Sequence, residues 1–177
     1  MDIYERIHES RKQHSPTLVF PPPSVVVPDK IWIGSMWDAR NTEWLKETGI
    51  THVINCASPL QSYKSSVMAK ADIQACLVLN TEDEESYEIL KKPLDDVVEF
   101  CNQAFSQNPK SKLLFHCMAG VNRSAALSLA YASVGDFPDA PTLPRGERFA
   151  KVFESLMIVR PNILTNCGFY EQLLKWL

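Results

Sequence analysis

Apolar residues repeat at helical spacing in several parts of the chain and predict amphipathic helices there. Residues 2–14, 94–105 and 147–160 each place their apolar side chains on one face, with charged residues elsewhere. Residues 41–48 predict a further helix, with a capping Asn-Thr pair at its start and a glycine after its end. Residues 124–134 carry small and apolar side chains on all sides, as expected for a helix in the middle of a domain.

Short apolar runs lie between these helices and predict strands. The predicted strands are residues 25–27, 31–34, 51–56, 73–79 and 112–115. A Pro-Asp turn joins the first two, and the next helix and strand continue a β-α-β pattern, which is typical of parallel pairing. The sequence therefore predicts an α/β fold: a single domain in which helices flank a central sheet that is mixed or mostly parallel.

Length, composition and charge narrow the class of protein. The chain has 177 residues, of which 45% are apolar and 22% charged, enough for one domain with a sizeable core. A net charge of −3 gives no general attraction for nucleic acid or for an anionic membrane, so neither is expected as a partner. The N-terminal residues lack the apolar core of a signal peptide, and no stretch of the sequence is apolar enough to predict a membrane span.

The cysteines predict a compartment. They are odd in number and irregularly spaced, at positions 56, 76, 101, 117 and 167. This pattern is not typical of a disulfide framework, and it contains no closely spaced pair of the kind that binds zinc. We therefore expect a reducing, intracellular location, with the cytoplasm favoured and nuclear entry left open.

Residues 116–124, His-Cys-Met-Ala-Gly-Val-Asn-Arg-Ser, connect the last predicted strand to the central predicted helix. A tight glycine-containing turn in this setting aims backbone N–H groups and the positive end of the helix dipole at one point, which makes an anion-binding loop. Cys117 is expected to be a thiolate, because both effects favour its charged form. Arg123 presents a planar pair of donors that matches two oxygens of a tetrahedral oxyanion. The loop therefore predicts a phosphate ligand and a nucleophilic cysteine.

The order His-Cys, five residues, Arg-Ser, between an apolar strand and an Ala-rich helix, resembles the signature loop of the cysteine-dependent dual-specificity protein phosphatases. The stretch IWIGSMWDARNTEWLKETGITHVINCAS, residues 31–58, is similar to the N-terminal half of that family. The ending VRPNILTNCGFYEQLLKWL resembles its C-terminal part, with Thr165 where the family usually has proline. The resemblance implies a protein tyrosine phosphatase-like fold, with a catalytic domain over residues 25–177 and a helix with a Pro-rich connector over residues 1–24.

The resemblance also implies a two-step reaction that uses no metal and no other cofactor. Cys117 attacks the phosphorus and forms a cysteinyl-phosphate, which water then hydrolyses. Ser124 donates a hydrogen bond that stabilises the departing thiolate, while His116 and Asn166 shape the site without contacting the substrate. Arg123 and the backbone N–H groups of the loop hold the phosphate oxygens. The residues expected to bind the phosphate are Met118, Ala119, Gly120, Val121, Asn122 and Arg123.

A general acid is needed to protonate the leaving oxygen. The acidic segment of residues 80–85 follows a predicted strand, and in the family the acid is an aspartate on this upstream loop. Counting from the strand favours Asp83, whereas counting back from the following helix favours Glu84. An extra residue before that helix, where Lys-Lys-Pro interrupts the usual helix start, reconciles the two counts. Asp83 is the preferred candidate.

The expected substrate is a phosphoprotein, dephosphorylated at tyrosine and at serine or threonine. The residues between Cys117 and Arg123 carry no charge, whereas inositide-directed members of the family place lysines there. Two alternatives stay open. An RNA 5′-triphosphatase of the same superfamily shares the asparagine before the arginine but characteristically lacks an acid like Asp83. A non-catalytic phosphate-binding scaffold has no need of a nucleophile.

Three further segments are candidates for partner or substrate recognition. The helix at residues 2–14 and its connector resemble the poxvirus members of the family, which also share Gly-Val-Asn-Arg-Ser in the loop. This implies a viral enzyme with an arm that forms a homodimer; the other interpretation is a helix that packs on its own domain. Residues 58–66 are a candidate for the substrate rim, with Tyr63 and Lys64 most able to contact a ligand, and the other interpretation is a solvated loop. The Pro-rich loop 136–146 is expected to have a structural or partner-specific role.

Overall fold

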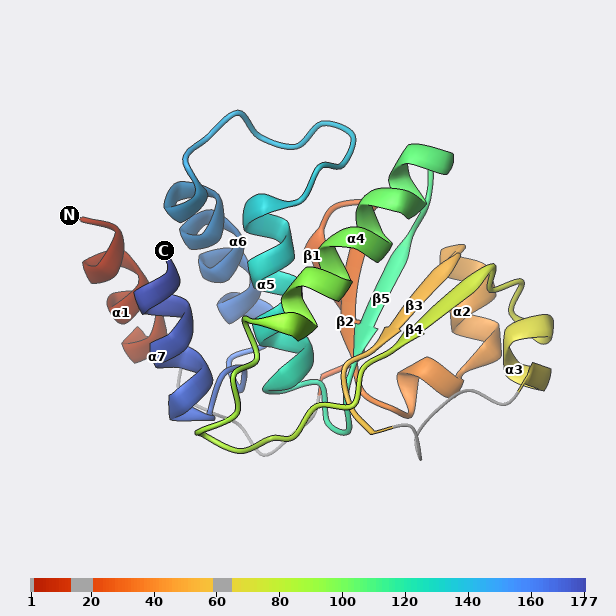
Figure 1. Ribbon diagram of the computed structural model, residues 1–177, viewed down its shortest axis with the longest axis horizontal. Helices are drawn as coiled ribbons and strands as arrows, with labels where there is room; N and C mark the ends of the chain where they lie inside the picture. Colours follow the sequence, from red (N-terminus) through yellow and green to blue (C-terminus); the bar gives the residue numbers. More distant parts are fainter. Residues whose placement is uncertain (1, 14–20, 59–64) are drawn as a thin grey trace.

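A five-stranded sheet forms the centre of the computed structural model, which describes residues 2–13, 21–58 and 65–177 (Figure 1). The strands are β1 (Ser24–Val27), β2 (Ile31–Gly34), β3 (His52–Asn55), β4 (Ala75–Val78) and β5 (Leu113–His116). Their order across the sheet is β1-β2-β5-β3-β4, in which β1 pairs antiparallel with β2 and the other neighbours are parallel. The predicted α/β fold with a mixed, mostly parallel sheet is therefore confirmed.

Helices cover both faces of this sheet (Figure 1). They are α1 (Ile3–Gln13), the short 3-10 helix η1 (Asp38–Arg40), α2 (Thr42–Thr48), α3 (Ser65–Lys70), α4 (Lys92–Gln107), α5 (Arg123–Val134), α6 (Arg145–Val159) and α7 (Cys167–Trp176). One face carries α2 and α3, the other carries α4 to α7, and α1 packs outside them against α6. Within the described ranges, no helix is long and apolar enough to span a membrane.

The helices agree with the sequence pattern except at a few boundaries. Asn41 caps α2 by accepting a hydrogen bond from the backbone N–H of Trp44 at 3.1 Å. The prediction that Lys-Lys-Pro interrupts the start of α4 is wrong, because Pro93 lies in the first turn of that helix, where no backbone donor is needed. The sequence did not predict α3, since its 6 residues are too few to show a helical period. The helix α6 begins at Arg145, before its predicted start.

The side chains of β5 alternate between two apolar cores. Leu113 and Phe115 are fully buried on the side of α4 to α7, whereas Leu114 is fully buried on the side of α2. The helix α5 lies inside the larger core, and every residue from 124 to 133 is buried. Because both β5 and α5 are enclosed, the loop that joins them is held firmly at both ends.

The N-terminal helix α1 packs on its own chain. Ile7 is fully buried. On the polar side, Arg6 forms ion pairs with two α6 carboxylates, at 2.8 Å to Glu147 and 2.9 Å to Glu154. The guanidinium of Arg11 lies over a tyrosine ring of α7, 4.0 Å from its centre. Ile7, in the middle of the apolar stripe, is thus covered within one chain, whereas Tyr4 is 45% exposed.

The parallel strands end at one common edge of the sheet. In the pairing register, Gly34 of β2 and Asn55 of β3 flank the last residue of β5. The segments that follow these strands therefore emerge side by side, at the edge where open α/β sheets bind their ligands. The predicted rim segment 58–66 begins at this edge, but Tyr63 and Lys64 lie outside the described residues.

Candidate active site

The Cys117 loop, residues 117–122, connects β5 to α5. Gly120 adopts a φ of 72°, and a Cβ at this position would lie 2.6 Å from the carbonyl oxygen of Gly34 and 2.5 Å from a guanidinium nitrogen of Arg160. Only glycine fits here. The loop is also tied to the segment after β2, because the backbone N–H of Met36 donates to the carbonyl oxygen of Met118 at 3.1 Å.

Arg160 holds the same loop from behind. This side chain is only 1% exposed. Its Nε donates to the carbonyl oxygen of Gly120 at 2.9 Å, and its Nη1 donates to the carbonyl oxygen of Pro22 at 2.9 Å and to Oγ of Ser24 at 3.2 Å. One buried arginine therefore joins the Cys117 loop to the chain that enters β1.

Cys117 is a buried thiol in a setting that favours its anion. Burial alone would raise its pKa, but hydrogen bonds from the Ser124 hydroxyl and from loop N–H groups, with the charge of Arg123, outweigh burial and lower the pKa. The Ser124 hydroxyl and the Gly120 N–H both donate to Sγ at 3.3 Å. Burial raises the pKa of the equally buried Cys101. The pKa of Cys117 is thus lowered where burial raises the pKa of Cys56, Cys76 and Cys101, and a lowered pKa is typical of a nucleophilic thiol.

His116 is 1% exposed, and burial lowers its pKa to about 4, so its ring is neutral at physiological pH. Its Nδ1 lies 3.3 Å from the carbonyl oxygen of Cys117. A neutral, enclosed imidazole in this position can orient the backbone next to the thiol, as the sequence predicts for it.

The Arg123 side chain opens α5 and bridges to the acidic segment. Its Nη1 donates to the carbonyl oxygen of Thr81 at 3.0 Å, and its Nε lies 3.7 Å from a carboxylate oxygen of Asp83. That Nε is buried and has no hydrogen-bond partner within the described residues. Thr81 is itself fixed, because its hydroxyl donates to the carbonyl oxygen of Cys56 at 2.8 Å. The guanidinium is therefore pre-positioned beside the loop.

Of the two candidate acids, the structure brings Asp83 and not Glu84 to the Cys117 loop. The carboxylate of Asp83 accepts hydrogen bonds from the amides of Asn166 at 3.0 Å and Asn122 at 3.4 Å. Glu84 instead lines a separate surface hollow with residues at the start of α4, among them Lys92. The geometry therefore favours Asp83, the residue that counting from the preceding strand predicts.

Two asparagines from distant parts of the chain hold this arrangement together. The side-chain oxygen of Asn122 accepts a hydrogen bond from the hydroxyl of Thr165 at 3.1 Å and another from the backbone N–H of Asn166 at 3.0 Å. The side chain of Asn122 is therefore engaged within the protein, and its expected contact with a phosphate is through its backbone N–H group. Asn166 also caps α7 by accepting from the N–H of Phe169. The sequence signals the cap but not the contact with Asp83, since the two residues are 83 positions apart.

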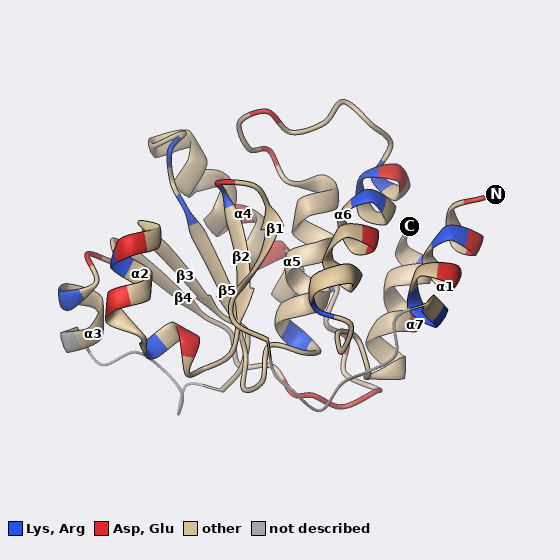
Figure 2. Cartoon of the chain, turned by 180° about the vertical axis from the view of Figure 1, so that it is seen from behind, with Lys and Arg blue, Asp and Glu red and all other residues tan. Residues whose placement is uncertain are grey.

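The other predicted phosphate-binding residues lie along the loop surface. Met118 is 47% exposed, and Ala119 and Val121 are partly exposed. Within the described ranges, no group of three or more His, Cys, Asp or Glu side chains is arranged to hold a metal ion. Charged residues gather on the outer helices and loops, and the sheet and α5 are almost free of them (Figure 2).

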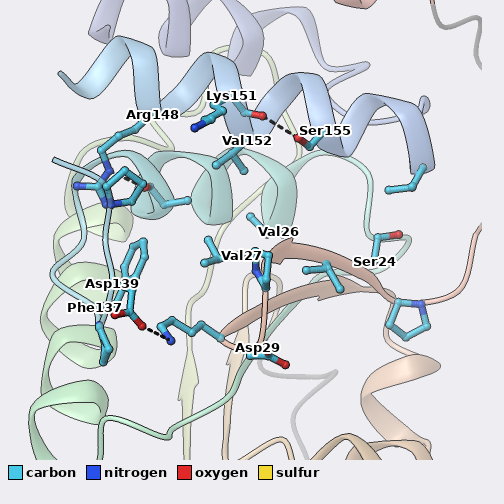
Figure 3. Close-up of a pocket in the computed structure, with 18 of the residues that line it drawn as sticks. Ser24, Val26, Val27, Asp29, Phe137, Asp139, Arg148, Lys151, Val152 and Ser155 are labelled. Atoms are coloured by element: carbon cyan, nitrogen blue, oxygen red, sulfur yellow. Dashed lines mark hydrogen bonds and ion pairs between the residues drawn. The ribbon is translucent and has the colours of Figure 1, made fainter. Parts of the chain in front are cut away.

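A cavity of about 910 Å³ lies away from this site, between β1, the loop before α6, and α6 itself (Figure 3). Val26, Phe137 and Val152 give it an apolar wall, and an ion pair of 3.5 Å between Lys30 and Asp139 closes one side. None of its lining residues belongs to the Cys117 loop. The Pro-rich segment 136–146 thus helps to form a second concave surface, separate from the nucleophile.

The chain is similar to a known protein family and to several known proteins. Residues 31–133, more than half of the chain, match the family model described as "Dual specificity phosphatase, catalytic domain". The chain is 27% identical over 154 residues to MAP kinase phosphatase with leucine-rich repeats protein 2 of Dictyostelium discoideum and 29% identical over 154 residues to human protein phosphatase Slingshot homolog 1. Each alignment covers 87% of this chain but only 19% and 13% of those relatives, so the chain spans a small part of their length.

Solved structures share the fold over nearly the whole chain. OH1 from the Orf virus, described as a tyrosine phosphatase, matches with a TM-score of 0.73 and 23% identity, covering 98% of this chain and 96% of that chain. Human DUSP28 matches with a TM-score of 0.69 and 26% identity, covering 91% and 96%. The predicted protein tyrosine phosphatase-like fold is confirmed.

Replacing Ser124 by alanine is expected to raise the pKa of Cys117, because the variant loses the hydroxyl that donates to Sγ. A hydrogen bond to a charged group contributes about 1.5–3 kcal/mol, so the pH profile of alkylation of Cys117 by iodoacetamide should move to higher pH by about 1 to 2 pH units. The rate measured against pH gives the result. Ser128→Ala is the matched control, because that buried hydroxyl donates to the backbone of its own helix and should leave the profile unchanged. Identical profiles for Ser124→Ala and the wild type would contradict the assignment.

Proposed function

This chain belongs to the dual-specificity phosphatase family, and on that premise we propose that it is a protein phosphatase acting on phosphotyrosine and on phosphoserine or phosphothreonine. One observation carries the proposal: three groups of complementary chemistry meet at one sheet edge. They are the thiol of Cys117 with its lowered pKa, the guanidinium of Arg123, and the Asp83 carboxylate 3.7 Å from that guanidinium. A protein that only binds phosphate needs the second group but neither of the others.

In the first step the Cys117 thiolate attacks phosphorus in line with the leaving oxygen. A sulfur–phosphorus bond forms, the phosphorus–oxygen ester bond breaks, and Asp83 gives its proton to the leaving oxygen. Arg123 and the N–H groups at the start of α5 hold the remaining phosphate oxygens, where negative charge is concentrated in the transition state. Because these donors are already fixed by Gly120 and Arg160, little reorganisation is needed when the substrate binds.

In the second step water hydrolyses the cysteinyl-phosphate. The Asp83 carboxylate takes a proton from the water while the water oxygen forms a bond to phosphorus. The sulfur–phosphorus bond breaks, and Cys117 leaves as a thiolate. The Ser124 hydroxyl, 3.3 Å from Sγ, stabilises that thiolate as it departs. Inorganic phosphate is released and the starting state is restored.

A phosphoprotein is favoured as the substrate over an RNA 5′-triphosphate end. The Cys117 loop carries no lysine or arginine before Arg123, the upstream segment is acidic, and an aspartate stands at the loop. A highly charged polyanion bound at the loop would lie close to the carboxylate of Asp83, with Glu82 and Glu84 as its chain neighbours. The names of the relatives, MAP kinase phosphatase and protein phosphatase Slingshot, agree with a phosphoprotein substrate.

We further propose that residues 25–177 act as the catalytic domain and that residues 1–24 serve as an appended arm able to form a homodimer. Support comes from the contacts of α1, which packs through the buried Ile7, pairs with α6 through Arg6 and stacks on Tyr170 of α7 through Arg11. The same contacts can form between two chains if the arm is exchanged.

The proposed location is a reducing intracellular compartment. All five cysteines are free thiols, and a nucleophile with a lowered pKa is easily oxidised outside such a compartment.

Replacing Cys117 by serine is expected to lower turnover of para-nitrophenyl phosphate and of phosphotyrosyl and phosphothreonyl peptides by at least about 10⁴-fold, because the covalent nucleophile is lost. Steady-state rates and phosphate release measure the effect. Cys101→Ser is the control, since that buried thiol lies away from the loop. Full turnover by Cys117→Ser would contradict the covalent mechanism, and faster release from 5′-triphosphate RNA than from peptides would reverse the proposed substrate.

Replacing Asp83 by asparagine is expected to lower kcat for a phosphothreonyl peptide by about 100-fold or more, because an alkoxide leaves poorly without a proton donor. The loss should be smaller for para-nitrophenyl phosphate, whose leaving group needs little protonation. Glu84→Gln is the matched control and should change kcat by less than about twofold. If Glu84→Gln carries the larger loss, the acid is Glu84.

Removing residues 1–14 is expected to convert a dimer into a monomer, because the apolar stripe around Ile7 is lost. Light scattering coupled to size exclusion over a range of concentrations measures the mass. Tyr4→Ala, an exposed change on the same helix, should leave the mass unchanged. A full chain that stays monomeric at all concentrations would contradict the dimer.

A further inference from the structure

Trp37 stands out among the four tryptophans of the chain because its side chain is 70% exposed. Trp32 is 8% exposed, and the other two are partly buried. Leaving so large an aromatic surface in water forgoes the gain from burying it. A single exposed aromatic needs an explanation only if its position suggests what covers it.

The position of Trp37 is beside the Cys117 loop. β2 and β5 run parallel, with Gly34 paired to His116, so the segments that follow them leave the sheet together. The backbone N–H of Met36 donates to the carbonyl oxygen of Met118 in the loop at 3.1 Å. Trp37 is the next residue after Met36 and so lies close to the loop. The Met118 side chain is itself 47% exposed. Two large apolar side chains are thus exposed on neighbouring segments next to the nucleophile.

The turn that carries Trp37 is rigid. The Ser35 hydroxyl donates to the Asp38 carboxylate at 2.7 Å and accepts from the N–H of Trp37 at 3.2 Å, and the N–H of Ser35 donates to the same carboxylate at 2.7 Å. The guanidinium of Arg40 lies 5.7 Å from the centre of the Trp37 ring. A surface aromatic that is already ordered loses little entropy when it binds a ligand.

The rims on the two sides of the loop differ in chemistry. The segment after β4 is acidic and supplies Asp83, while the segment after β2 supplies Trp37 and the cationic Arg40. A phosphorylated residue seated in the Cys117 loop belongs to a chain that continues past one or both rims. The side chain next to the phosphorylated residue on the β2 side therefore meets an aromatic ring.

We propose that Trp37, together with Met118, forms a subsite for an apolar or aromatic side chain that flanks the phosphorylated residue of a protein substrate. This inference rests on the proposed phosphatase function and adds a specificity residue to it. Trp37 contacts the substrate away from phosphorus, so it selects among phosphopeptides without taking part in the chemical steps.

A nucleobase could also stack on an exposed tryptophan. The acidic segment on the other side of the loop and the net charge of −3 oppose an RNA chain, so the peptide is the favoured occupant.

The test compares pairs of phosphotyrosyl peptides that differ only in one residue, leucine or glycine, placed within two positions of the phosphotyrosine on either side. The wild type should favour the leucine peptide by about tenfold in kcat/KM at one of these positions. Trp37→Ala should reduce that ratio to about twofold or less, and Trp37→Phe should keep most of it. Leu143→Ala is the matched control, since this residue is 42% exposed in the loop before α6, at the far end of α5 (Figure 1), and should leave the ratio unchanged.

The outcomes separate this inference from the proposed function. Hydrolysis of all peptides with no preference in the wild type, or with the same preference in Trp37→Ala, would overturn the subsite and leave the phosphatase intact. Turnover of para-nitrophenyl phosphate without turnover of any phosphopeptide would overturn the proposed function, and the subsite with it. A loss in Trp37→Ala confined to 5′-triphosphate RNA would assign the ring to a nucleobase and overturn the peptide subsite.

Discussion

The constraint on which the site depends is the stabilisation of negative charge on a sulfur atom that is almost completely buried. Burial by itself opposes that charge, as the raised pKa values of Cys56 and Cys101 show. Cys117 differs because it lies at the start of α5, where N–H groups and the Ser124 hydroxyl point at Sγ. The turn that achieves this requires glycine at position 120, since Gly34 and Arg160 leave no room for a side chain. The same tight turn at Gly120 thus packs the loop against its neighbours and directs the donors that lower the pKa of the Cys117 thiol.

The acidic segment is held against this loop by contacts from three parts of the chain. Asn122 reaches it from the loop, Asn166 from the start of α7, and Arg123 binds the carbonyl oxygen of Thr81. The backbone fits closely as well, because a Cβ at Gly168 would lie 1.9 Å from the carbonyl oxygen of Glu85. A hydrogen bond adds only about 1 kcal/mol, but together these contacts fix the Asp83 carboxylate beside Arg123 and the Cys117 loop. Positioning of this kind contributes more to catalysis than the strength of any single contact.

Most of the fold could be predicted from the sequence, because α4 shows a one-sided helical pattern, while β5 and α5 are runs of apolar and small residues typical of fully buried elements. The sequence predicts Cys117 as a nucleophile and Arg123 as a phosphate ligand because both lie in one short strand-turn-helix stretch, and the structure places both residues at the start of α5. The choice between Asp83 and Glu84 could not be derived by counting, since it depends on Asn166, which is distant in sequence and near in space. Pro93 misled the prediction because a proline that interrupts a helix interior is tolerated in its first turn. Trp37 gave no signal, because exposure is a property of the fold.

A loop that binds phosphate through backbone N–H groups and one arginine recognises the phosphate and little else. The amide of Asn122 is engaged within the protein, and the loop side chains before it are uncharged. Discrimination among phosphorylated ligands therefore has to come from the rims, which are unlike each other. The acidic rim carries Asp83, the proposed proton donor, whereas the rim after β2 carries the exposed Trp37 ring beside the guanidinium of Arg40. On the proposed function, a phosphorylated residue seated in the loop would place its leaving oxygen toward Asp83 on one side and a flanking side chain toward Trp37 on the other.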